Sequence, residues 1–182
     1  MSGEASWLLL IDLQRIFGEP PSPWAAPDFG PAAAGADRLR AAFGDRVAVT
    51  RFLPHTPPTG AWVGYYEQWP FAADPASADL YDLVPPFDRV PLRIDRAAFG
   101  KWDAETADLL EHPAEIFLAG VSTDCCVLST ALAAADAGVQ VRVVTDACAG
   151  ATEADHQRAL DAMALYAPLI ELTTVAEVLA AR

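Results

Sequence analysis

Two adjacent cysteines follow a short polar turn. An apolar run ends at three residues with side-chain oxygens, and the two cysteines come next: Ser122, Thr123, Asp124, Cys125 and Cys126. Such oxygens cap helix N-termini, so a cysteine should lie in the first helical turn, where unpaired N–H groups and the helix dipole favour the thiolate. The same N–H groups could hold the oxyanion that forms when a carbonyl is attacked. The pattern predicts a cysteine nucleophile at a strand-to-helix turn.

The two neighbouring cysteines compete for this role. Residues adjacent on a helix point about 100° apart, so we expect one of Cys125 and Cys126 to face the site. Cys148 is expected to pack as a small hydrophobic residue. The three cysteines form neither a disulfide framework nor a CxxC metal spacing, which indicates free thiols in a reducing compartment.

A thiol that attacks an amide also needs a base and a proton route to the leaving group. Asp12 follows five apolar residues, and Asp146 closes a later apolar run. Polar residues at the carboxyl ends of parallel strands gather at the ligand-binding edge of a sheet. We predict that Asp12 is the base, with capping of the following helix as the alternative.

The elements that would position these residues alternate along the chain, as in βαβ units with a parallel sheet. Apolar runs predict strands over 7–11, 46–51, 90–94, 115–121, 140–145 and 169–172. Helices are predicted over 32–43, 104–111, 124–137 and 153–165, and a last one from residue 175. Right-handed crossovers make this an α/β fold, a three-layer α/β/α sandwich. The pattern alone leaves the strand order open.

Between His55 and Asp88 the periodicity fails, and prolines and aromatic residues accumulate. A loop this long in a compact domain is usually functional, so we predict a lid or a wall of the binding site. A packing flap or a contact between subunits is the alternative. Trp62 and Trp69 from this segment, together with Phe17, are candidates for binding a small, flat and mostly apolar substrate.

The composition indicates one globular domain over residues 1–182, with 53% hydrophobic and 20% charged residues. A formal net charge of −13 repels a phosphate backbone, so nucleic acid is not expected as a partner. The apolar runs are far shorter than the roughly 20 residues of a membrane span. The first residues lack the basic start of a signal peptide. We therefore predict a cytoplasmic protein that binds no membrane.

With these residues assembled, the chain resembles the isochorismatase-like cysteine hydrolases, which include nicotinamidases and N-carbamoylsarcosine amidase. Leu10–Gln14 resembles the family's Asp-x-Gln strand end, and Gly120–Val127 resembles its Gly-Val-x-Thr-x-x-Cys-Val nucleophile turn. Val143–Ala147, with His156 in the next helix, is similar to its later strand and helix. The resemblance covers most of the chain and assigns the nucleophile to Cys126.

The resemblance implies a six-stranded parallel sheet in the order 3-2-1-4-5-6, an Asp-Lys-Cys triad that includes Asp12, and a non-proline cis peptide bond. We expect the cis bond between Val121 and Ser122, in the turn that would bind the oxyanion. The register of the triad lysine points to Arg96, but a guanidinium does not readily give up a proton. We favour Lys101, the only lysine in the chain. A surface lysine with no role is the alternative.

Nicotinamidases of this family carry Asp-x-His and a second His for a metal near the second strand. The matching region here, Thr50–His55, has no carboxylate before the histidine and no second His nearby. We therefore predict no metal and no other cofactor, and we do not expect pyridine-amide specificity of the metal-dependent kind.

The leading hypothesis is an amidohydrolase with a small-molecule substrate. Asp12 takes the Cys126 proton, the sulfur attacks an amide or ureido carbonyl, and water releases the thioester. A cation from Lys101 or Arg96 would balance both charges. One alternative is vinyl-ether hydrolysis of an isochorismate-like acid, and another is a catalytically idle binding module. We also predict a homodimer or larger homo-oligomer, with the segment 55–88 near the contact.

Overall fold

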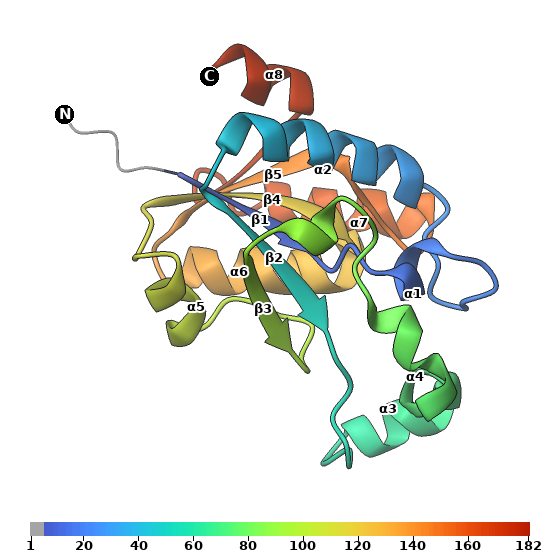
Figure 1. The fold of residues 1–182 in the computed structure, drawn as a ribbon. Helices are drawn as coiled ribbons and strands as arrows, with labels where there is room; N and C mark the ends of the chain where they lie inside the picture. The colour runs from blue at the N-terminus through green and yellow to red at the C-terminus, as the bar shows by residue number, and fades with distance from the viewer. Residues whose placement is uncertain (1–5) are drawn as a thin grey trace.

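A six-stranded sheet forms the centre of the computed structural model, which describes residues 6–182 (Figure 1). The strands are β1 (Trp7–Ile11), β2 (Val47–Phe52), β3 (Leu92–Arg96), β4 (Glu115–Val121), β5 (Gln140–Ala149) and β6 (Ile170–Thr173). All neighbouring strands run parallel, in the order β3-β2-β1-β4-β5-β6. The predicted strand order is confirmed. The carboxyl ends of all six strands therefore lie along one edge.

Helices cover both faces of the sheet and complete the predicted three-layer sandwich (Figure 1). On one face lie α2 (Phe29–Phe43) and α8 (Val175–Ala180), and α2 packs on β1, β4 and β5. On the other face lie α5 (Ala104–Leu109), α6 (Leu128–Asp136) and α7 (Glu153–Ala164). Across the described part of the chain, no helix has the length and apolar character that a membrane crossing requires.

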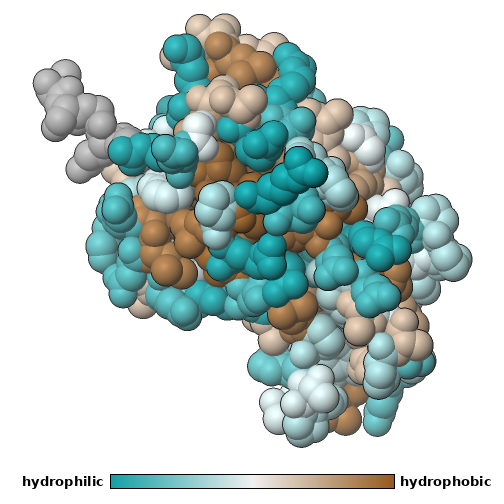
Figure 2. Space-filling model, in the orientation of Figure 1, coloured by the Kyte–Doolittle hydropathy of each residue, from teal (hydrophilic) through white to brown (hydrophobic). Residues whose placement is uncertain are grey.

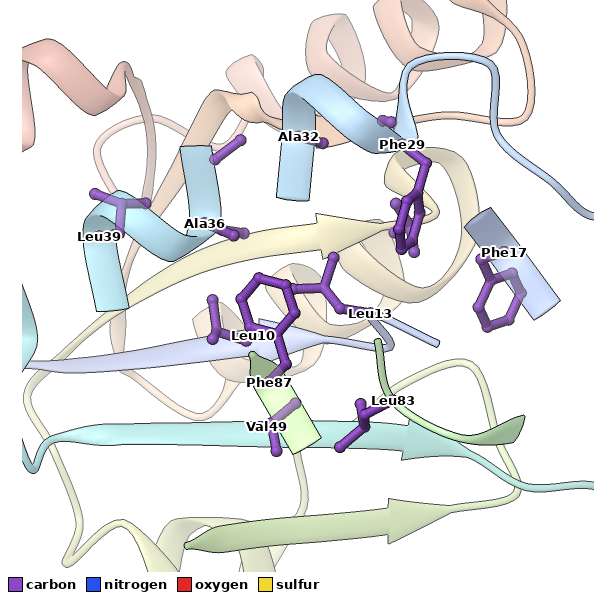
Figure 3. Close-up of a cluster of buried hydrophobic side chains, with 14 of the residues drawn as sticks. Leu10, Leu13, Phe17, Phe29, Ala32, Ala36, Leu39, Val49, Leu83 and Phe87 are labelled. Atoms are coloured by element: carbon purple, nitrogen blue, oxygen red, sulfur yellow. The ribbon is translucent and has the colours of Figure 1, made fainter. Parts of the chain in front are cut away.

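The central strand β1 is buried on both faces because its residues alternate between two apolar clusters. Leu8 and Leu10 pack into the cluster beneath α2, whereas Leu9 and Ile11 pack into the cluster beneath α6 and α7. All four are fully buried. Figure 3 shows Leu10 between the strands and the residues of α2. Burial of each such side chain contributes roughly 1.5–3 kcal/mol, so β1 holds the residue after it firmly.

The segment between β2 and β3 differs from the prediction of a loop without regular structure. It contains the short helices α3 (Trp62–Gln68) and α4 (Pro70–Ala73) and two 3₁₀ turns, Pro75–Tyr81 and Phe87–Arg89. A proline opens α4 and the first 3₁₀ turn, as expected for a first helical position. The two helices form a lobe at the lower right of Figure 1. Prolines in the sequence therefore mark helix starts here.

The aromatic residues of this lobe are buried or half-buried within the chain. Trp62 packs on Tyr65 and Tyr66, and Tyr66 is buried. Among the described residues 53–91, Val63 is the one large hydrophobic residue that is exposed. On the face drawn in Figure 2, the lobe shows mainly hydrophilic to neutral colours. Self-association, with the segment 55–88 near the contact, stays a prediction.

Strand β5 is longer than predicted, and this changes the position of Asp146. The strand continues to Ala149, so Asp146 lies within it rather than at its end. The Asp146 carboxylate accepts a hydrogen bond of 2.7 Å from the Val175 amide at the start of α8. The expectation that Asp146 belongs with the chemistry at the strand ends was wrong, because its carboxylate holds a helix terminus.

Candidate active site

Asp12 is held in one orientation at the end of β1. Its backbone has a positive φ of 47°, and its side chain is fully buried. The Asp12 amide donates to Thr50 Oγ1 at 3.1 Å, and the Thr50 hydroxyl donates to Asp12 Oδ1 at 2.5 Å. Thr50 belongs to the neighbouring strand β2. One carboxylate oxygen is thereby occupied, and the other, Oδ2, is left for chemistry.

Lys101 supplies the counter-charge to Asp12. Its ammonium lies 3.0 Å from Asp12 Oδ2, and both side chains are fully buried. The ammonium also donates to the Ala98 carbonyl at 2.6 Å and lies 5.1 Å from the centre of the Phe52 ring. An unpaired buried charge is strongly destabilising, so each of the two ions requires the other.

The loop that carries Lys101 is fixed by hydrogen bonds to its backbone. The Lys101 amide donates to Thr130 Oγ1 of α6 at 3.0 Å, and the Thr106 hydroxyl of α5 donates to the Lys101 carbonyl at 2.7 Å. The same Thr130 hydroxyl donates to the Cys126 carbonyl at 2.6 Å. Thr130 therefore links the lysine loop to the turn that carries the cysteine.

Arg96, the alternative cation, lies at the end of β3 and has other partners. Its guanidinium pairs with Asp103 at 2.8 Å and with Glu105 at 3.1 Å, and it donates to the Thr106 hydroxyl. It does not line the pocket above Cys126. Lys101, rather than Arg96, therefore lies beside Asp12. Arg96 instead pairs with Asp103, the residue that caps the start of α5.

The turn after β4 brings Cys126 against this ion pair. A π-turn over Thr123–Val127 replaces the first turn of the helix predicted from Asp124, and α6 begins after it. The peptide bond between Val121 and Ser122 is cis. Gly120 has φ 126°, and a Cβ there would lie 2.1 Å from the Ile11 carbonyl oxygen. Only glycine lets β4 end this close to β1 and Asp12.

The Cys126 side chain is almost completely buried, with 3% exposed. This burial raises the pKa of the Cys126 thiol well above its ordinary value, the nearby Asp12 carboxylate raises it further, and the Lys101 ammonium lowers it. Burial and Asp12 therefore favour the protonated thiol. The helix start was expected to favour a thiolate, but desolvation and the Asp12 carboxylate act against the charged form here, so the resting thiolate stays a prediction.

A proton acceptor is available for that thiol. No described residue donates a well-directed hydrogen bond to Asp12 Oδ2, although the Lys101 ammonium lies near it. A buried carboxylate oxygen with a free lone pair is a competent base once it lies beside an acid. The arrangement can move the Cys126 proton to Asp12 while Lys101 keeps the local charge balanced.

A cavity of about 360 Å³ opens above the cysteines, and most of its lining is aromatic or otherwise apolar. It is lined by Phe17, Pro23, Trp24, Ala25, Phe52, Tyr65, Trp69, Phe99, Ser122, Asp124, Cys125, Cys126 and Ala151. The candidates Phe17 and Trp69 are therefore in the wall. Trp62 is not, since it packs behind the wall against Phe99, with ring centres 5.2 Å apart. Its assignment to substrate binding is corrected.

Both neighbouring cysteines border the cavity, contrary to the expectation that one of them would. Cys126 lies at the base with Asp12, whereas the half-buried Cys125 lies nearer Asp124. Burial raises the pKa of Cys125 to about 11. Cys148 is buried, and burial raises its pKa to about 12, in keeping with its predicted packing role.

The motif residues Gln14 and His156 form hydrogen bonds that connect the segments around the site. The fully buried Gln14 amide accepts from the Phe52 amide at 2.8 Å and donates to the carbonyls of Phe52 and Tyr81 at 3.0 and 2.7 Å. His156 Nδ1 lies 2.8 Å from Thr123 Oγ1 in the nucleophile turn. Gln14 thus links the chain after β1 to β2 and to the 3₁₀ turn Pro75–Tyr81, and His156 links α7 to the nucleophile turn.

Trp24 is the main residue that sequence reasoning missed. It stacks on Phe17 with ring centres 6.0 Å apart and contacts Tyr65, Trp69 and Phe71 from the lobe. Phe52, Phe99 and Thr50 were also missed. A tryptophan in the proline-rich stretch shortly after Asp12 was an available signal.

The residues near the second strand do not fit a resident metal. His55 at the end of this strand has the Trp62 ring as its neighbour, with ring centres 6.4 Å apart. Within residues 6–182, no group of three or more His, Cys, Asp or Glu side chains is placed to hold an ion. A metal-free reaction remains a prediction.

Comparison with solved structures finds the same fold. A cysteine hydrolase from Pseudomonas syringae pv. phaseolicola 1448A has a TM-score of 0.82 at 18% identity, over 98% of this chain and 92% of that one. An isochorismatase family protein from Desulfovibrio vulgaris subsp. vulgaris str. Hildenborough has a TM-score of 0.79 at 19% identity, over 98% of this chain and 100% of that one. A pyrazinamidase from Pyrococcus horikoshii in complex with zinc has a TM-score of 0.75 at 20% identity, over 93% of this chain and 99% of that one.

Sequence comparison gives the family. No curated protein sequence matches the chain. Residues 6–177 match the family model described as Isochorismatase domain, which spans nearly the whole chain. The predicted family is confirmed: the chain belongs to the isochorismatase family of hydrolases.

Proposed function

We propose that the protein is a cysteine-dependent amidohydrolase that cleaves a small amide or ureido compound through a thioester. The observation that carries this proposal is the buried cluster of Asp12, Lys101 and Cys126 beneath the aromatic cavity. A thiol, a base and a fixed cation are the groups that nucleophilic attack on a carbonyl requires. Their burial strengthens the charge interactions among them.

In the first half-reaction the Cys126 proton moves to Asp12 Oδ2 as the sulfur bonds to the carbonyl carbon, and the carbonyl electron pair moves to its oxygen. When this intermediate collapses, the C–N bond breaks. The leaving nitrogen takes the proton from Asp12, so ammonia or an amine departs and a thioester remains. Lys101 keeps Asp12 paired before and after each transfer.

In the second half-reaction water attacks the thioester carbon and gives a proton to Asp12. The C–S bond then breaks, the acid departs, and the Cys126 sulfur recovers its proton. The raised pKa of Cys126 makes the thiolate a poor resting state and favours this return. The active site therefore ends each cycle in its starting protonation state.

The test is an ammonia-release assay with a panel of small amides and N-carbamoyl compounds in excess chelator. We expect turnover by the parent protein, and a loss of at least about a thousandfold in Cys126→Ala, because the nucleophile is absent. Acid-quenched intact mass should find the acyl group on Cys126. The chelator should not change the rate.

Other outcomes identify the other functions. Turnover that survives Cys126→Ala would favour a reaction that needs only the aspartate, such as vinyl-ether hydrolysis. Ligand binding without turnover by the parent protein would favour the binding module. Activity lost in chelator and restored by zinc would contradict a metal-free mechanism.

A further inference from the structure

We infer that the cavity selects amides that carry an aromatic or flat apolar group and no negative charge, and that Asp124 imposes this selection. The inference rests on the proposed amidohydrolase function and adds to it the charge of the substrate and the residue that sets it. It is supported by the lining of the cavity, the position of Asp124, and the pairing of Lys101 with Asp12.

The wall favours flat apolar groups. Six of its side chains are aromatic: Phe17, Trp24, Phe52, Tyr65, Trp69 and Phe99. Phe17 and Trp24 are stacked with only 9° between their planes, and Trp69 meets Trp24 edge-on at 66°. Ring faces and edges at such angles bind a planar group from several sides.

One carboxylate lies in this wall. Asp124 Oδ1 accepts a hydrogen bond of 2.9 Å from the Ala151 amide, and Cys125 Sγ lies 3.7 Å from Oδ2. The carboxylate is thus held in place beside the cysteines. Its charge and that of Asp155 add to burial in raising the pKa of Cys125, as expected where the local potential is negative. Among the described lining residues, none is Lys, Arg or His.

The lysine beneath the cavity is already paired with a carboxylate. Lys101 is paired with Asp12 and lies against the Phe52 ring, which belongs to the cavity wall. Arg51, the residue before Phe52 in β2, pairs with Asp95 at 2.6 Å. An incoming carboxylate would lose its hydration in an apolar cavity, find no free partner, and face Asp124. A neutral group of the same shape meets none of these costs.

The experiment compares two ligands of the same shape, terephthalamide, which is neutral, and 4-carbamoylbenzoate, which is its monoanion. Binding to Cys126→Ala is measured by tryptophan fluorescence, so turnover is not required. We expect the neutral ligand to bind at least about tenfold more tightly, the scale of a close like-charge contact near a protein surface. Adding Asp124→Asn, which keeps the acceptor for the Ala151 amide, should reduce this ratio below about threefold.

The matched control adds Asp161→Asn, which removes the same charge from the exposed face of α7. We expect this change to leave the ratio of affinities as it was. Raising the salt concentration from about 0.02 M to about 0.5 M should reduce the ratio without any further substitution, because salt screens the repulsion. The salt arm keeps the test valid if Asp124→Asn does not fold.

Equal or tighter binding of the anion, or a ratio that neither salt nor Asp124→Asn reduces, would overturn the inference. Failure of both ligands to bind at millimolar concentration would also overturn it. Selective binding of terephthalamide to Cys126→Ala, with no ammonia released by the parent protein, would support this inference and count against the proposed hydrolysis.

Discussion

The buried polar centre and the aromatic wall above it are built in opposite ways. In the centre, Asp12 contacts Thr50 and Lys101 at 2.5–3.1 Å, and all three side chains are fully buried. In the wall, half-buried Trp24 contacts Tyr65 and other rings with centres about 6 Å apart. The centre relies on directional polar contacts, whereas the wall relies on the area and angle of its rings.

This difference suggests that the centre governs catalysis, whereas the wall governs the affinity for substrate. Removal of one buried ion leaves its partner without compensation, so a change in the centre should affect both catalysis and folding. Removal of one ring leaves several others in place, so a change in the wall should mainly weaken binding. Variants in the two regions should therefore differ in what they lose.

Lys101→Met should reduce turnover by roughly 100-fold or more, because it removes the cation that balances the proton transfers. It should also lower the free energy of unfolding by about 3–5 kcal/mol, since the Asp12 carboxylate stays buried without a partner. The measurements are kcat on any amide that the parent protein cleaves and urea unfolding by circular dichroism.

Arg96→Gln is the matched control for the lysine. Its partners are the partly exposed carboxylates of Asp103 and Glu105, so we expect less than about a threefold loss of turnover. Addition of Asp12→Asn to Lys101→Met should recover stability but no activity, because the uncompensated charge and the base are removed together. An inactive Arg96 variant beside an active Lys101 variant would reverse the assignment of the cation.

Trp24→Ala should raise KM by about tenfold and change kcat little, because the lost ring contacts are worth on the order of 1.4 kcal/mol. Trp62→Ala is the comparison, since Trp62 packs behind the wall and does not line the cavity. It should lower stability and change KM by less than about threefold. A larger KM effect at Trp62 than at Trp24 would mean that the cavity is bounded differently.

The same division explains what the sequence could predict. The strands β1 and β4 were predicted to the residue, because each contains an uninterrupted apolar run. Asp12 and Cys126 follow those two strands closely, so their position in the chain already places them at one edge of a parallel sheet. Thr50 gave no such signal, since a threonine within a strand looks like any other β-branched residue.

The wall could not be predicted in this way. Trp24 meets Tyr65 and Trp69 from a segment about 40 residues further on, and no periodicity marks either segment. The helices α3 and α4 are too short to be stable alone, so packing in the lobe decides that they form. Residues that act through tertiary contacts leave little trace in a local pattern.

The smallest effect is expected at the cysteine that borders both regions. Cys125→Ala should change kcat/KM by less than about threefold, because the half-buried thiol lies on the cavity wall and not at the ion pair. The same variant removes the neighbouring thiol, so the titration of Cys126 can be followed by the rate of iodoacetamide labelling and by peptide mass, which separates Cys126 from Cys148. Since burial and Asp12 raise the pKa of Cys126, its thiolate fraction is small at neutral pH and still rises past pH 9. The labelling rate should therefore increase by about tenfold per pH unit from pH 7 to 9 without levelling. A plateau below pH 8 would indicate a resting thiolate, and would place the positive charge of Lys101 above burial as the dominant influence on the nucleophile.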